Sequence, residues 1–173
     1  MKIEKLSKLP KGKIIQLFEV LRRDQRTVDG LWFLAVEKNY GLDRAVEFDA
    51  AVWAEIGRIN AQRLKKTFNL ETRGIRGLIE AIGIDPLWLF FNYEVKRLSK
   101  TEAVMQFTNC PAQEGRKKMG KEVFPCQRVD EGYFTAFAKV IDPRIRVKCG
   151  FCPPKKGFPG LWCEWYFTVE EGE

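Results

Sequence analysis

The hydrophobic residues of this chain change their spacing near Pro86, and that change most limits what the chain can fold into. Before this point, apolar side chains recur every three or four residues, which is typical of amphipathic helices. After it, apolar and polar residues alternate in two pairs of segments, as Leu89 and Phe91 do in the first, which predicts half-buried strands. We therefore expect an α+β protein, with N-terminal helices packed on an antiparallel sheet of two hairpins and two helices between the hairpins.

The N-terminal half is predicted to be helical throughout. The helical pattern over 11–39 is expected to divide near Thr27, whose hydroxyl would cap a second helix. Gly41 ends that helix, and a long helix over 42–67 is the predicted spine of the domain. A short helix over 72–82 completes this half.

The C-terminal half is predicted to hold one hairpin over 89–107 and another over 145–169. Between them, two short helices are expected over about 110–119 and 125–140, each opened by a Cys-Pro or Pro-Cys pair. The two hairpins are expected to pair into one sheet. The aromatic strand over 161–169 then lies either in the middle of that sheet or at an edge, where it would pair across a homodimer.

The length of 173 residues predicts a single domain over 1–173, with the helical half at 1–85 and the cysteine-containing half at 86–173. The composition, 45% hydrophobic and 31% charged, is that of a globular protein. No apolar run reaches the roughly 20 residues that a membrane-spanning helix needs, and no apolar segment follows the lysine-rich start. We expect a cytoplasmic protein with no membrane contact.

The net charge of +7 is concentrated at one end of the chain. Residues 1–26 carry eight Lys and Arg against three Asp and Glu, or +5, which leaves only +2 for the rest. Binding to phosphate backbones needs a basic patch on the fold itself, so this distribution argues against nucleic acid as a partner. The basic loop at Lys155 and Lys156 instead indicates attraction for a small anionic molecule.

The chain contains no histidine, which excludes several kinds of catalytic and metal site. Histidine is the commonest general base at neutral pH and the commonest metal ligand. Ser-His-Asp and Cys-His catalysis and every histidine-containing zinc site are therefore ruled out. Chemistry here must come from Cys, Asp, Glu, Lys, Arg, Tyr or a bound cofactor.

Five cysteines, an odd number in a chain without a secretory leader, indicate reduced thiols. Cys149 and Cys163 fall on the apolar sides of their strands and are expected to be buried. Cys110 and Cys126 begin predicted helices, where the helix dipole favours a thiolate and lowers the pKa of the thiol. Asp130 lies one turn after Cys126, as a base or a ligand.

The cysteines also allow a metal site. Cys149 and Cys152 form a C-x-x-C pair, which is typical of a metal knuckle or a redox pair. With two of Cys110, Cys126 and Cys163, this pair would hold Zn or an Fe–S cluster.

Other side chains of the two longest helices have two interpretations. Asp29, Glu37, Asp49 and Glu55 either bind a divalent metal or activate water between the helices, or are simply solvated. Trp32 and Trp53 are interpreted as core anchors or pocket walls.

The C-terminal half resembles the L-2-amino-thiazoline-4-carboxylate hydrolase-like family of small cytosolic proteins. The resemblance is carried by a series of short motifs, which are Asn109-Cys110-Pro111, Gly115 to Gly120, Pro125-Cys126 with Asp130, Tyr133 and Phe134, and the run from Trp162 to Phe167. It implies hydrolytic opening of a C–N bond in a small amino-acid-derived ring, with a thiolate or a metal-bound water as nucleophile. The pocket residues that it implies are Cys110, Cys126, Asp130 and Cys163.

The order of helices and hairpins also resembles that of the vinyl-reductase and vesicle-tethering ligand-binding domains, which implies small-molecule binding. Our leading hypothesis is a protein that binds or hydrolyses a small anionic molecule in a pocket between sheet and helices, with Cys110, Cys126 and Asp130 as catalytic candidates. The alternative is a non-catalytic Zn or Fe–S protein, and a third is a scaffold with buried structural thiols.

Overall fold

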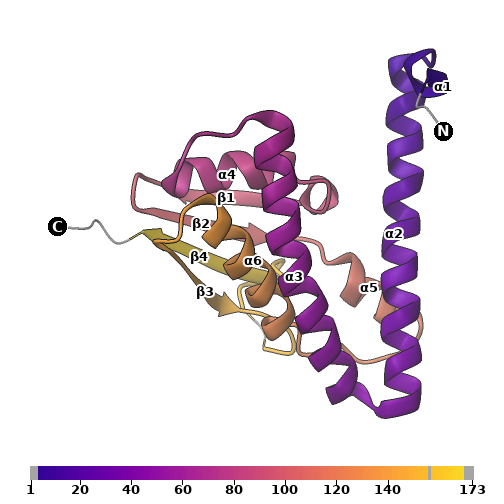
Figure 1. Cartoon of the computed structure of the whole chain (residues 1–173). Helices are drawn as coiled ribbons and strands as arrows, with labels where there is room; N and C mark the ends of the chain where they lie inside the picture. Colours follow the sequence, from indigo (N-terminus) through magenta and orange to yellow (C-terminus); the bar gives the residue numbers. More distant parts are fainter. Residues whose placement is uncertain (1–3, 156, 170–173) are drawn as a thin grey trace.

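The structure, a computed structural model, describes residues 4–155 and 157–169 and has the expected α+β architecture (Figure 1). The helices are α1 (Glu4–Ser7), α2 (Lys11–Tyr40), α3 (Leu42–Phe68), α4 (Gly74–Ile84), α5 (Pro111–Lys118) and α6 (Gln127–Ile141), with a short 3-10 turn at Trp88–Phe90. The strands are β1 (Tyr93–Leu98), β2 (Glu102–Phe107), β3 (Ile145–Phe151) and β4 (Cys163–Val169).

The two hairpins pair into one antiparallel sheet, as the sequence predicts. The strand order is β1-β2-β4-β3, and β2 joins the hairpins by pairing with β4, for example Met105 with Trp165 and Phe107 with Cys163. The aromatic strand β4 is therefore central. Of the two placements left open for this strand, the central one is confirmed, and the edge placement that would pair it with a second chain is excluded.

Leu89 and Phe91 do not belong to the first strand, contrary to the alternation in the sequence. Leu89 lies in the 3-10 turn, and Phe91 follows that turn directly. Asp85 stabilises the turn by accepting hydrogen bonds from the backbone N–H of Leu87 and Trp88. The strand begins only at Tyr93, because the chain first has to leave this turn.

Helix α2 is unbroken, so the predicted division near Thr27 is wrong. The Thr27 hydroxyl donates to the carbonyl oxygen of Arg23 at 2.9 Å, one turn earlier in the same helix, rather than capping a new one. The helix ends at Gly41, whose φ of 88° is a conformation that favours glycine. The predicted spine follows as α3.

The hydrophobic core lies between the sheet and the helices α6, α3 and α4 (Figure 1). Aromatic side chains from α6 and from the sheet are its largest members, which are Phe107, Tyr133, Phe134, Phe137, Trp165 and Phe167. Helices α3 and α6 approach closely because a methyl group at Gly57 would collide with the backbone of Tyr133. This close contact fixes α6 against α3 on one face of the sheet.

Helix α2 has a different relation to the core. It has no buried residue among those described, and its N-terminal end stands apart from the sheet (Figure 1). Its C-terminal end turns into α3 and lies beside α5. Within the part of the chain that the structure describes, no helix combines the length and the hydropathy that crossing a bilayer requires.

Candidate functional site

A cavity of about 770 Å³ lies between α2, α3, α5, the start of α6 and the central strands. Most of its lining is apolar, and aromatic side chains supply much of it, which are Phe33, Trp53, Trp88, Phe91, Phe107, Phe124, Tyr133, Phe134 and Trp165. Cys110, Cys126, Asp130 and Cys163 also line it. The structure thus brings together the four residues that the family resemblance points to.

The aromatic side chains form the inner wall. Trp88 stacks on Phe134 with ring centroids 4.7 Å apart, and Phe134 in turn contacts Trp165 at 5.3 Å. Trp165 is fully buried, and among the described residues its indole N–H has no hydrogen-bond partner. A buried donor without an acceptor is rare, and this one could donate to an ordered water or to a bound molecule in the cavity.

Three aspartate side chains, Asp29, Asp49 and Asp130, line the cavity from three different helices. Burial, followed by the charges of Asp29 and Asp130, raises the pKa of Asp49 to about 7. Burial also raises the pKa of Asp130 to about 7, against a hydrogen bond from Cys126, and raises that of Asp29. The indole of Trp53 hydrogen-bonds with Asp29 and Asp49 and opposes both shifts. Near neutral pH, Asp49 and Asp130 are therefore only partly ionised, and the three aspartates together carry less than three negative charges.

Basic side chains line the same cavity. Arg22, Arg23 and Arg26 come from one stretch of α2, and Arg116 and Lys118 come from α5. Together with the partial protonation of the acids, they make an anionic group acceptable on the α2 side of the cavity.

Arg116 fastens α2 to α5. Its guanidinium donates two hydrogen bonds to the Glu37 carboxylate, at 2.8 and 3.0 Å, and a third to the carbonyl oxygen of Glu122. The cation also lies against the rings of Phe33 and Phe124, at 5.6 and 5.5 Å from their centroids. This buried, two-pronged ion pair joins α2 to α5 at the cavity wall.

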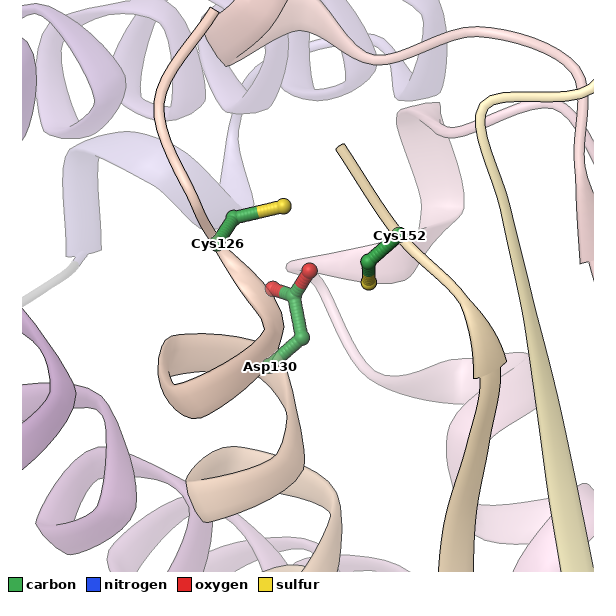
Figure 2. Close-up of side chains that lie close together, drawn as sticks. All are labelled: Cys126, Asp130 and Cys152. Carbon is green, nitrogen blue, oxygen red and sulfur yellow. The ribbon is translucent and has the colours of Figure 1, made fainter. Parts of the chain in front are cut away.

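Thiols and a carboxyl converge beside the cavity. Figure 2 shows Cys126 and Asp130, from the start of α6, and Cys152, which follows β3, pointing toward a common centre. The two sulfur atoms and a carboxylate oxygen lie within 4.8 Å of one another. Cys163 and Cys149 each hydrogen-bond with Cys152 as well. This thiol cluster, Cys126, Asp130, Cys149, Cys152 and Cys163, gathers four of the five cysteines.

Cys110 lines the cavity at the start of α5, but its thiol is not activated. Burial, with the nearby charges of Asp130, Cys126 and Cys163, raises its pKa well above the usual range, although a backbone hydrogen bond opposes this. The sequence predicted the opposite direction from the helix dipole, and that prediction is wrong because desolvation outweighs the dipole. Burial likewise raises the pKa of Cys149, to about 11.

The two glutamates of the long helices lie apart from the two aspartates that line the cavity. Glu37 pairs with Arg116, and Glu55 is exposed and pairs with Arg58, so neither joins Asp29 and Asp49.

The two tryptophans of the long helices also differ in their surroundings. Trp53 lines the cavity, whereas Trp32 is 70% exposed and is neither a core anchor nor a pocket wall. Lys155 is exposed and is absent from the cavity lining, and Lys156 lies outside the described residues.

Sequence reasoning missed three features of the site: the unpartnered Trp165 indole, the arginines of α2, and Arg116. Arg116 and Glu37 are 79 positions apart, so no local pattern could have paired them. The arginines did carry a signal, because they recur within one stretch of a helix whose opposite face is apolar.

Comparisons with known proteins bear on fold and family. A model for a family of unknown function, DUF6125, matches residues 6–169. No curated protein matches the chain. Eight chains of solved structures match, among them the phenol-responsive sensory domain of the transcription activator PoxR, solved with phenol. That structure aligns with a TM-score of 0.55 and 13% identity, over 81% of this chain and 72% of that one, which shows a shared fold.

Proposed function

This chain belongs to DUF6125, a family of unknown function, and we propose that it is a ligand-binding domain holding one small aromatic molecule in its cavity. The observation that carries this proposal is the aromatic wall with the buried, unpartnered indole N–H of Trp165. An aromatic ligand would stack on the wall, and an acceptor atom on it would receive the Trp165 hydrogen bond.

The size and lining of the cavity support this. About 770 Å³ falls within the roughly 300–1,000 Å³ of small-molecule sites, which are mostly apolar and carry few polar groups. The PoxR sensory domain, which was solved with phenol, has the same fold and supports a ligand of this class.

The charges around the cavity refine the proposed ligand. Arg22, Arg23 and Arg26 favour an anionic group on the α2 side, whereas the carboxyls of Asp49 and Asp130, with pKa values near 7, oppose it only partly. A small aromatic acid meets both the apolar wall and this basic edge.

Calorimetric titration of the full chain with benzoate, phenol and toluene tests the proposal. Benzoate and phenol should bind more tightly than toluene, because only they offer an acceptor to Trp165. In Trp165→Phe, loss of one buried hydrogen bond should weaken benzoate and phenol by about 10-fold and leave toluene unchanged.

Trp32→Phe is the matched control, because Trp32 is exposed and does not line the cavity. The proposal is overturned if none of the three compounds binds the folded protein, or if Trp165→Phe weakens toluene as much as benzoate.

A second function, metal binding, is favoured by the thiol cluster. Cys126, Asp130 and Cys152 offer two sulfurs and an oxygen close enough for one ion, and Cys163 lies beside Cys152. Sulfur donors with one carboxylate suit Zn²⁺, which binds thiolates tetrahedrally. An ion here would tie the start of α6 to the end of β3, at the edge of the cavity.

Elemental analysis of protein purified in the presence of Zn²⁺ tests this. Near-stoichiometric zinc is expected, with most of it lost in Cys152→Ser. Cys110→Ser is the control that should keep zinc, since Cys110 is not among the three candidate ligands. Zinc-free wild-type protein, or equal loss in both variants, contradicts the metal site.

Hydrolysis of a ring C–N bond is the reaction that the family resemblance implies, and Asp130 would then act as the base. A thiol nucleophile needs a lowered pKa, and Cys110 has a raised one, so binding without turnover fits the site better. Slow alkylation of Cys110 near neutral pH is expected, and fast alkylation would favour the hydrolase instead.

A further inference from the structure

Helix α2 has two functional faces. Arg22, Arg26, Asp29 and Phe33 follow one another at helical spacing and line the cavity. The opposite face carries an apolar stripe, which consists of Ile14, Leu17, Leu21, Val28, Leu31 and Ala35. The spacing of these residues, three or four apart, places them on one side of the helix.

The stripe is exposed along its whole length. Leu21, Val28 and Leu31 are 60%, 56% and 62% exposed, although side chains of this kind are normally buried. From residue 14 to residue 35 the stripe is about 32 Å long at 1.5 Å per residue. Exposed apolar side chains that recur over this length of one helix face mark a contact with another surface.

We infer that the stripe pairs with the same stripe of a second copy of this chain, in an antiparallel helix pair. Paired over about 32 Å, the two stripes would cover one another's exposed apolar side chains and remove them from water. A repeat of apolar residues every three or four positions is also the pattern that helix pairs use.

The middle of the stripe specifies the direction of pairing. Asp24 and Gln25 are its exposed polar interruption, halfway between Ile14 and Ala35. In an antiparallel pair, Asp24 of one copy faces Gln25 of the other and can accept its amide hydrogen bond. In a parallel pair, Asp24 would face Asp24, and the like charges would repel.

Asp24 also favours a second protein copy over a lipid surface. A basic amphipathic helix is a usual feature of membrane-surface binding. A carboxylate in the centre of the apolar face would have to be desolvated there without a partner and would be repelled by anionic lipid. The cavity face of α2 stays free for ligand in the paired arrangement.

Sedimentation of the full chain over a range of micromolar concentrations tests the inference. The wild type should be a dimer, and Leu21→Glu with Val28→Glu should weaken dimerisation by about 100-fold or more while circular dichroism stays unchanged. The matched control is Leu98→Glu, because Leu98 is as exposed as Val28, at 56%, but lies on the β1–β2 hairpin. It should remain a dimer.

A short bifunctional thiol crosslinker tests the direction. Gln25→Cys should crosslink to itself across the two-fold axis, and Ile14→Cys should not, because its copies lie at opposite ends. Peptide mass analysis identifies which cysteine has reacted. Self-crosslinking of Ile14→Cys would overturn the antiparallel arrangement.

The other outcomes overturn the inference outright. These are a wild type that is monomeric at every concentration, a dimer that survives the double variant, and a monomer that binds vesicles of anionic lipid through the stripe. Because no ligand is needed, failure of this test leaves the proposed ligand binding intact.

Discussion

Helices α6 and α2 form opposite walls of the same cavity, but different forces hold them. Helix α6 buries six side chains in the core and touches α3 through glycines. Helix α2 buries none among the described residues and is attached near its C-terminal end by Arg116 and Glu37. The comparison teaches that the core holds one wall, whereas the other depends on an ion pair and on the packing of half-buried side chains such as Phe33, so we expect the α2 wall to open more easily than the α6 wall.

The largest expected effect is on the core wall. Phe134→Ala removes a fully buried ring that stacks on Trp88 and should lower the free energy of unfolding by about 3–5 kcal/mol. Urea denaturation measures this, with Phe48→Ala as control, because Phe48 is 50% exposed and its change should stay within about 0.5 kcal/mol. Equal losses in the two variants would break the comparison.

The next effect is on the attachment of α2. Arg116→Met should cost up to about 3 kcal/mol locally, because it leaves the largely buried Glu37 carboxylate with only the half-exposed Lys121, 3.3 Å away, as a cationic partner. Amide hydrogen exchange should rise through α2 while α6 and the sheet stay protected.

Adding Glu37→Gln to that variant should restore part of the protection in α2, since no charge is then stranded. Exchange that rises equally in α2 and α6 would mean that the two walls are one cooperative unit.

A smaller expected effect is the pH dependence of stability on the core side of the molecule. Arg144 holds the pKa of Asp142 down to about 2, and the backbone N–H groups of Arg144 and Gly74 contribute. This stabilisation, about 2 kcal/mol, is complete above pH 4 and is lost as the pH falls toward 2, because the folded state binds this proton more weakly than the unfolded state.

Urea denaturation between pH 5 and pH 2 measures this loss. Asp142→Asn should be less stable than wild type at pH 5 and should show a weaker dependence on pH. The same acid dependence in wild type and variant would contradict the assignment.

The smallest expected effect, on the free energy of unfolding, tests whether α2 is one helix or two. Thr27→Ala removes a hydroxyl that bonds within α2, so the free energy of unfolding should change by less than about 0.5 kcal/mol. A helix cap at the same position would cost about 1 kcal/mol. Thermal unfolding of the two proteins side by side decides between these values.

Much of the fold could be predicted from the sequence, because most helices and strands bury one face, and their apolar residues therefore recur at a regular spacing. The change of period at Pro86 separated helices from hairpins, and Cys-Pro and Pro-Cys located α5 and α6. Thr27 misled the prediction, since a threonine within a helix can bond to the preceding turn just as well as cap a new helix.

The site was predicted less completely. The sequence singled out Cys126 and Asp130 through helical spacing, but it gave no reason to prefer Cys152 over the other thiols as their neighbour. That choice depends on how β3 ends beside α6, which is a matter of tertiary packing. The prediction of a lowered pKa for Cys110 failed for the same reason, because the burial that raises this pKa is a property of the folded cavity.

The strand order β1-β2-β4-β3 has a consequence for how the protein folds. Each hairpin forms between neighbouring strands, but β2 meets β4 only after the whole segment of α5, α6 and β3 has been brought into place. Closing that long loop costs chain entropy before its contacts compensate for it, so the β2–β4 pairing is expected to be the slow step of folding. The inner wall of the cavity, to which Phe107 of β2 and Trp165 of β4 both contribute, would then be among the last parts of the molecule to form.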